Sequence, residues 1–281
     1  MKSAPHLSRI IEPYSALFCD VWGVIRDGHA LLAPAVEALQ KTRTTGRPVI
    51  LVSNSPRPFG EVARQLAYMG APVDAWDGIV TSGDATRLAL SRYAPGPFFK
   101  IGPDGGDDRL YDGLDLSFRD PASARAAVCT GLVSSIGGHP DDYTDLFEDL
   151  IARELPLICA NPDIVVQVGD DLVWCAGALA RKYREMGGNC VISGKPHAPI
   201  YELAYDQLAE KGWQGERSSV LAIGDGPETD LAGAERMGID ALFIADGILG
   251  RDLAGRDEEA ARAILAEYDT RASWLASRLV W

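Results

Sequence analysis

The sequence predicts an α/β protein, a doubly wound parallel sheet into which a second α/β unit is inserted. Short apolar runs alternate with helical patterns at the start of the 281-residue chain and again near its end. This alternation is typical of parallel strands joined by crossover helices. The middle differs, because a stretch rich in Gly, Asp and Pro (95–113) leads into a further set of strand and helix patterns.

The first half of the sheet is predicted from apolar runs that end in small or polar residues and from helical patterns that follow them. We expect strands in 15–20, in 47–54 and at the start of 76–94, and helices in 34–46, in 58–70 and in the remainder of 76–94. Glycines at residues 46 and 70 mark the ends of the first two helices.

The same order returns after residue 190. We expect strands in 190–196, 219–225 and 240–247, helices in 198–212 and 228–238, and a helical last stretch over 256–281. Between the halves, the pattern predicts further strands and a helix in 126–133, 141–154, 155–163 and 166–174, with a loop at Gly137 and Gly138. The predicted domains are therefore a core of 1–83 and 190–281 and an inserted cap of 84–189.

Composition narrows the classes of function. The chain is 47% hydrophobic and 24% charged, as expected for a folded globular protein. Its net charge of −13 argues against nucleic-acid and anionic-membrane partners. The five cysteines show no CxxC spacing, and the chain has neither an apolar leader nor a run of roughly 20 apolar residues. These features predict buried thiols and a cytoplasmic protein.

Polar residues follow four of the predicted strands. Each feature alone has an ordinary structural explanation, such as a helix cap or a turn. Ligands of parallel α/β sheets collect at the carboxyl ends of the strands, so the four together indicate one site. The residues are Asp20, Ser53 with Asn54, Lys195, and Asp225 with Asp230.

The chain resembles the haloacid dehalogenase superfamily, in particular its class IIA branch of nitrophenylphosphatases and NagD-like sugar phosphatases. The resemblance rests on the ordered segments FCDVWGVIRDG, LVSNSPR, CANPD, WCAGALA, ISGKP and IGDGPETDLAGAERMG, which extend from residue 18 to about residue 238. It implies a Mg²⁺-dependent phosphatase for a small phosphorylated metabolite of the sugar or nucleotide phosphate class. It also implies a homodimer that pairs through the cap.

The resemblance further implies roles for individual residues. Asp20 would be the nucleophile that forms a phospho-aspartate, Ser53 would bind the transferring phosphoryl group, and Lys195 would neutralise charge between them. Magnesium would be held by Asp20, by Asp225 and by the backbone carbonyl of Trp22. Asp230 would either belong to the metal site as an outer-sphere residue, without a direct bond to the ion, or hold Lys195. Substrate contacts are expected from Trp22, Gly23, Asn54, Ser55, Asn161 and Asp163.

Trp22 departs from the family pattern. Most phosphatases of this superfamily have a second aspartate at this position, which protonates the leaving oxygen and later activates water. Tryptophan cannot do this near neutral pH. Trp22 then either packs beneath the cap or contacts a flat or apolar part of the substrate. Other candidates for the proton donor are Asp27, His29, His139 and His197.

Two alternative functions follow. A protein that kept the metal site and lost turnover would be a phosphate-ligand binding or regulatory protein, and Trp22 favours this alternative. A dinucleotide-binding oxidoreductase would need GxGxxG after the first strand, where this chain has DVWGVIRDG.

Overall fold

The computed structural model describes residues 1–28, 30–105, 107–134, 138–168, 171–253 and 258–281. The chain folds into two compact units. The first unit comprises Met1–Ser53, Ala63–Val80 and Lys195–Trp281, and the second comprises Asn54–Val62 and Thr81–Gly194. The second unit therefore interrupts the first one along the sequence.

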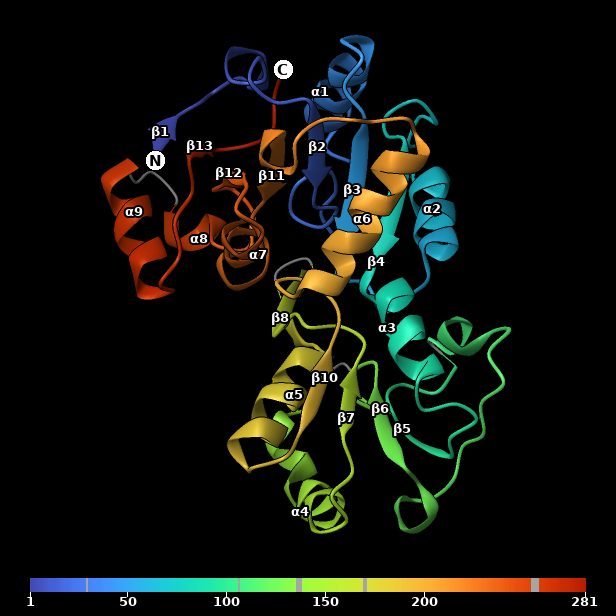
Figure 1. The fold of residues 1–281 in the computed structure, drawn as a ribbon. Coiled ribbons are helices and arrows are strands. Elements are labelled where there is room, and N and C mark those ends of the chain that lie inside the picture. Colours follow the sequence, from blue (N-terminus) through green and yellow to red (C-terminus); the bar gives the residue numbers. More distant parts are fainter. Residues whose placement is uncertain (29, 106, 135–137, 169–170, 254–257) are drawn as a thin grey trace. The chain divides into compact units, whose positions relative to one another are not determined.

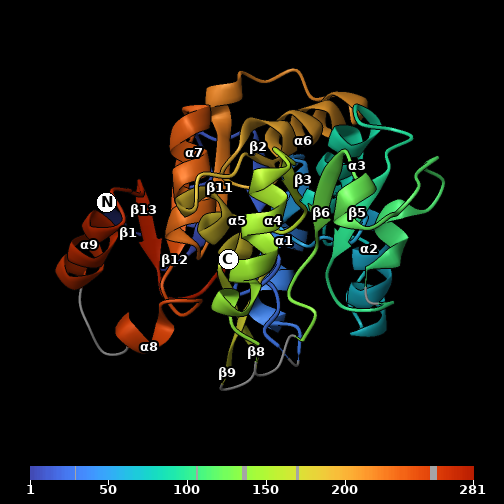
Figure 2. The same cartoon turned by 90° about the horizontal axis from the view of Figure 1, so that it is seen from below.

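The first unit is built on a seven-stranded sheet. Its strand order is β1 (Lys2–Ser3), β13 (Trp274–Ala276), β12 (Asp240–Ile244), β11 (Val220–Gly224), β2 (Ala16–Cys19), β3 (Val49–Ser53) and β4 (Gly78–Thr81). The pairs from β1 through β3 are parallel. Strands β2, β3 and β11 are buried along their whole length, as expected for central strands covered on both faces. Both views show β1 beside β13 and near α9 (Figures 1 and 2).

Helices cover this sheet. They are α1 (Ala33–Thr44), most of α2 (Phe59–Tyr68), α6 (Ala198–Glu210), α7 (Ala232–Met237), α8 (Gly250–Leu253) and α9 (Glu258–Glu267). In α1, Pro34 lies in the first turn, and Val36, Leu39 and Thr42 recur at helical spacing on the buried face. Helix α6 contacts β3 and α7, and Figure 1 shows it lying along the sheet. None of the helices in the described ranges is long and apolar enough to cross a membrane.

The second unit has its own parallel sheet. The order is β10 (Cys190–Ile192), β7 (Leu157–Cys159), β6 (Ala126–Cys129) and β5 (Phe98–Ile101), accompanied by helices α3 (Ser82–Ser91), α4 (Thr144–Ala152) and α5 (Ala176–Glu185). An antiparallel hairpin of β8 (Val165–Val168) and β9 (Asp171–Trp174) completes it. Phe147 and Tyr183 belong to one buried apolar cluster, and Leu90 and Phe98 to another.

The segment Asn54–Val62 belongs to the second unit because it is hydrogen-bonded there. The Asp84 carboxylate accepts from the Phe59 N–H at 3.1 Å while also completing the capping box of α3 with Thr81. The Arg57 Nε lies 3.3 Å from an Asp107 carboxylate oxygen.

The parallel α/β fold class is confirmed, and two features differ from the sequence expectation. The predicted cap was 84–189, whereas the second unit extends to Gly194 and its strand β10 pairs with β7. The prediction of helix throughout 256–281 is wrong beyond α9, because Trp274–Ala276 forms β13 between β12 and β1. Of the loop predicted at 137 and 138, residue 137 lies outside the described residues.

Candidate active site

The site lies where the strand order of the seven-stranded sheet reverses. From the adjacent pair β2 and β11, successive strands are added in opposite directions, toward β4 on one side and toward β13 on the other. Such a switch point leaves a crevice at the carboxyl ends of the strands. Asp20 follows β2 directly and Asp225 follows β11 directly. The Asp20 N–H donates to the Ile223 carbonyl at 2.8 Å, which fixes the nucleophile candidate to the neighbouring strand.

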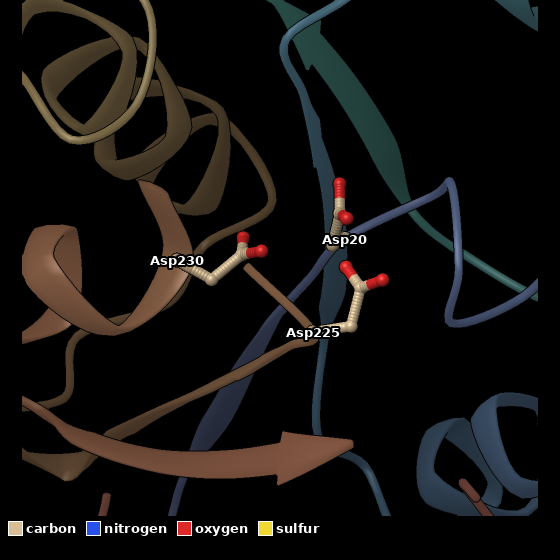
Figure 3. Close-up of side chains that lie close together, drawn as sticks. All are labelled: Asp20, Asp225 and Asp230. Atoms are coloured by element: carbon tan, nitrogen blue, oxygen red, sulfur yellow. The ribbon is translucent and has the colours of Figure 1, made fainter. Parts of the chain in front are cut away.

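Three buried carboxylates meet at this point. One oxygen each of Asp20, Asp225 and Asp230 lies within 4.8 Å of the others, and Figure 3 shows the three groups close together. Lys195 Nζ donates to Asp20 Oδ1 at 2.6 Å and to Asp230 Oδ1 at 2.7 Å. When all are ionised, three negative charges face one positive charge, a net −2. Buried, oxygen-only donors with excess negative charge suit a hard divalent cation such as Mg²⁺.

Asp230 is placed to hold Lys195. It lies in a short π-helical turn (Pro227–Leu231), and its Oδ2 accepts from the Gly226 N–H at 3.1 Å while Oδ1 accepts from the lysine. Gly224 permits this approach, because a Cβ there would lie 2.1 Å from Asp230 Cγ. The donors on both oxygens favour the lysine-holding role among the two expected for Asp230.

The Asp225 carboxylate lies close to the backbone of two other segments, at Gly23 and at Ile248. Its Oδ2 accepts from the Ile248 N–H at 2.7 Å. Gly23 has a φ of +78°, and a Cβ there would lie 2.0 Å from Asp225 Oδ2. A side chain at residue 23 would therefore displace this carboxylate, so Gly23 helps to shape the carboxylate cluster, a role that the sequence did not reveal.

We expect Gly23→Ala to lower Mg²⁺ affinity by roughly 10–100-fold, as loss of a supporting contact around a metal ligand typically does. Isothermal titration with Mg²⁺ measures this. Gly46→Ala is the matched control, since Gly46 has a similar φ of +80° but nothing within 4 Å of the added Cβ. Both variants should lose about 1–2 kcal/mol of stability from the left-handed backbone. Equal Mg²⁺ affinities in the two variants would contradict this account of Gly23.

The electrostatics of Asp20 depend on burial. Burial, and next the charge of Asp230, raises the pKa of Asp20 well above its usual range, while Lys195 opposes the shift. A carboxyl with a raised folded-state pKa stabilises the fold when protonated. That contribution is lost as the pH rises from the ordinary carboxyl range toward the raised pKa. The ionised, metal-free site therefore lowers stability, and a bound cation offsets this loss.

We accordingly expect Mg²⁺ to raise the thermal unfolding midpoint at about pH 8 and to do so less at about pH 5, where protonation of Asp20 competes with the metal. At 100-fold excess over its Kd, the metal would add about 2.7 kcal/mol. Asp225→Asn should lose most of the shift. The control Asp246→Asn, at an exposed carboxylate 3.8 Å from Arg278, should keep it. A shift of the same size in Asp225→Asn would contradict the metal assignment.

Ser53 ends β3 beside Asp20's strand and is 7% exposed. Three of the other predicted substrate residues are joined by hydrogen bonds within the second unit. Asn54 Nδ2 donates to Asp163 Oδ1 at 2.8 Å, and the Asp163 N–H donates to Asn161 Oδ1 at 3.1 Å. The Ser55 hydroxyl accepts from the Arg57 N–H at 3.2 Å. The Asn54–Asp163 contact joins residues 109 positions apart, which sequence spacing alone does not reveal.

Trp22 is half-buried and stacks on an arginine that the sequence reading missed. The guanidinium carbon of Arg26 lies 4.2 Å from the centre of the Trp22 ring, and the two residues also form an isolated backbone bridge. Asp27 behaves as the predicted turn cap, because its carboxylate accepts from the Ala30 N–H at 2.8 Å.

Of the histidine candidates for proton transfer, the structure describes His139 and His197. His139 accepts from the Asp141 N–H within the second unit. His197 immediately precedes α6 as its N-cap residue. His29 lies outside the described residues. Two residues after Asp20, this chain has the aromatic ring of Trp22, with the Arg26 guanidinium over its face, where most relatives have an acid.

The sheet order and the charged cluster define an α/β protein with a carboxylate site suited to a metal. A family model described as haloacid dehalogenase-like hydrolase matches residues 17–113, and a second, described as HAD-hydrolase-like, matches 192–269. A solved haloacid dehalogenase-like hydrolase from Brucella suis is 41% identical over 99% of this chain and 100% of its own, with a TM-score of 0.88. The chain belongs to the haloacid dehalogenase-like hydrolases.

Two named phosphatases are more distant relatives. D-glycerol 3-phosphate phosphatase of Mycobacterium tuberculosis is 24% identical over 98% of this chain and 75% of its own. Ribonucleotide monophosphatase NagD of Escherichia coli is 23% identical over 84% of this chain and 89% of its own. The M. tuberculosis glycerol phosphate phosphatase has been solved with magnesium, and that structure superposes with a TM-score of 0.67 at 21% identity over 99% of this chain and 78% of its own. These relatives support the class of phosphoric monoester hydrolase.

Proposed function

We propose that this protein is a Mg²⁺-dependent phosphatase that hydrolyses a small phosphorylated metabolite through a phospho-aspartate on Asp20. The observation that carries the proposal is the buried arrangement of Lys195 between Asp20 and Asp230, with Asp225 beside them. The names of the relatives support phosphorylated glycerol and ribonucleotide compounds as the general class of substrate.

In the first step, a carboxylate oxygen of Asp20 attacks phosphorus while the bond between phosphorus and the leaving oxygen breaks. Lys195 donates to Asp20 Oδ1, so that oxygen is held and the carboxylate is oriented for attack by the other one. The Ser53 hydroxyl would donate to the phosphoryl group, whose charge Lys195 would help to neutralise. Magnesium, held by Asp20, Asp225 and the Trp22 carbonyl, would supply further positive charge.

In the second step, water attacks the acyl phosphate, releases inorganic phosphate and restores Asp20. Both steps lack the aspartate that most relatives in the superfamily use at position 22. The leaving oxygen therefore departs with its electron pair and takes its proton from water. This favours esters whose leaving groups are weak bases, such as aryl and acyl phosphates.

Asn54, Ser55, Asn161 and Asp163 stay predicted substrate contacts, and their hydrogen bonds to neighbours indicate a preordered surface rather than separate mobile groups. A homodimer paired through the second unit and a cytoplasmic location are also predictions. The first is tested by light scattering of the purified protein and the second by cell fractionation.

Release of inorganic phosphate from a panel of phosphorylated metabolites, measured with Mg²⁺ and with EDTA, tests the proposed function. We expect Mg²⁺-dependent release from at least one small phosphate ester or acyl phosphate. If such compounds bind but none of them releases inorganic phosphate, the result would instead support the phosphate-binding, regulatory alternative that Trp22 favours. No binding and no release across the panel would contradict both functions.

A further inference from the structure

Arg26 is a buried cation that forms no salt bridge with any carboxylate in the described part of the chain. It is 4% exposed, and its Nε donates to the backbone carbonyl of Asp27 at 2.9 Å. Among the residues that the structure describes, no carboxylate forms a salt bridge with this guanidinium. Burial lowers the pKa of Arg26, and the charge of the neighbouring Asp27 opposes this shift. Burying an unpaired charge is costly, and it is retained where the charge has a use. The guanidinium lies over the face of Trp22.

Backbone hydrogen bonds tie Arg26 to the catalytic end of the sheet. The Gly23 N–H donates to the Arg26 carbonyl at 2.8 Å, and the Arg26 N–H donates to the Val21 carbonyl at 3.1 Å. Gly23 in turn lies against the Asp225 carboxylate. The backbone of Arg26 is thereby fixed relative to Gly23, which adjoins the Asp225 carboxylate.

We propose that Arg26, stacked on Trp22, partly compensates for the missing acid by stabilising the negative charge that develops on the leaving oxygen. This inference rests on the proposed function, because it takes residue 22 as the neighbour of the leaving group. The bond between phosphorus and oxygen breaks, the oxygen keeps the electron pair, and water supplies the proton afterwards. Arg26 is thus a positioning residue. It orients the indole ring of Trp22, and its guanidinium places a positive charge on one face of that ring.

The expected size of the effect follows from distance. With the leaving oxygen on the opposite face of the indole, the charge would lie about 8 Å away. At an effective dielectric constant of about 20, a unit charge at that distance changes a rate by roughly 30-fold. This is smaller than the roughly 10²–10⁴-fold supplied by a general acid, so Arg26 would compensate only in part.

The inference predicts a dependence on leaving-group basicity that a purely structural arginine would not produce. Turnover of a series of aryl phosphates, from nitrophenyl to unsubstituted phenyl phosphate, is measured for wild type, Arg26→Met and Arg26→Lys. Arg26→Met should lose little with the nitrophenyl ester and roughly 10–30-fold with the most basic leaving group. Arg26→Lys should retain most of the wild-type dependence, because it keeps the charge. Arg26→Gln is measured in parallel and replaces Arg26→Met if that variant does not fold.

Loss by one common factor across the series, or equal behaviour of Arg26→Lys and Arg26→Met, would overturn the inference. Mg²⁺ affinity and the unfolding midpoint are measured for each variant, so that damage to the metal site is recognised as a uniform loss. A failure of the proposed function is a different result: wild type itself would then release no phosphate from any ester of the series with Mg²⁺ present.

Discussion

Asp20→Asn is expected to abolish phosphoryl transfer, with a loss on the order of 10⁶, because a neutral amide does not attack phosphorus. The variant should still fold. Asp20 follows a strand rather than filling the core, and burial already disfavours its ionised form. The unfolding midpoint of the metal-free variant should therefore not fall below that of wild type.

Asp27→Asn is the matched control for this substitution. Asp27 lies in the same loop but caps a turn through Ala30, so phosphate release should be retained. Mass spectrometry of the Asp20→Asn protein excludes deamidation back to aspartate. Wild-type turnover in an intact Asp20→Asn protein would refute the mechanism. A large loss in Asp27→Asn with an unchanged unfolding midpoint and Mg²⁺ affinity would show that Asp27 contributes more than a turn cap.

Restoring the acid by Trp22→Asp is expected to raise turnover of alkyl phosphates far more than turnover of para-nitrophenyl phosphate. A nitrophenolate departs unaided, whereas an alkoxide is strongly basic and needs a proton as it leaves. The gain in the ratio of alkyl to nitrophenyl turnover has a ceiling of roughly 10²–10⁴. Steady-state phosphate release from both substrate types, wild type against variant, gives this ratio directly.

The neighbouring Arg26 should make the gain from Trp22→Asp depend on pH. A carboxylate at position 22 beside the guanidinium would have its pKa lowered, since a nearby positive charge favours the ionised form. The alkyl gain should therefore grow as the pH falls toward the ordinary carboxyl range. Circular dichroism verifies folding, because removing the indole also uncovers Arg26. If wild type already hydrolyses an alkyl phosphate at about 10 per second, another group donates the proton, and His197 is the next candidate.

The proximity of the residues at the ends of β2, β3 and β11 could be predicted because topology brings these strand ends together. Asp20 and Asp225 each follow an apolar strand and Ser53 ends one, and parallel strands that are neighbours end at the same edge of the sheet. The helix patterns were equally readable where a glycine or proline marks a boundary, as at both ends of α1.

Features that depend on tertiary contacts could not be read from the sequence. Strand β13 has three residues, and it is a strand only because β12 and β1 lie on either side of it. The stack of Arg26 on Trp22 requires the closed backbone loop between them. The need for glycine at residue 23 comes from Asp225, some two hundred positions later in the chain.

In the proposed mechanism, Asp20 carries the phosphoryl group during turnover. The most direct test mixes excess enzyme with acyl phosphate or para-nitrophenyl phosphate and Mg²⁺, quenches with acid within the first turnover, and maps the modified peptide by mass spectrometry. We expect one added phosphoryl group on the peptide that contains Asp20, absent from the Asp20→Asn protein. Full release of inorganic phosphate at every time point, with the same labelling background in wild type and Asp20→Asn, would contradict it.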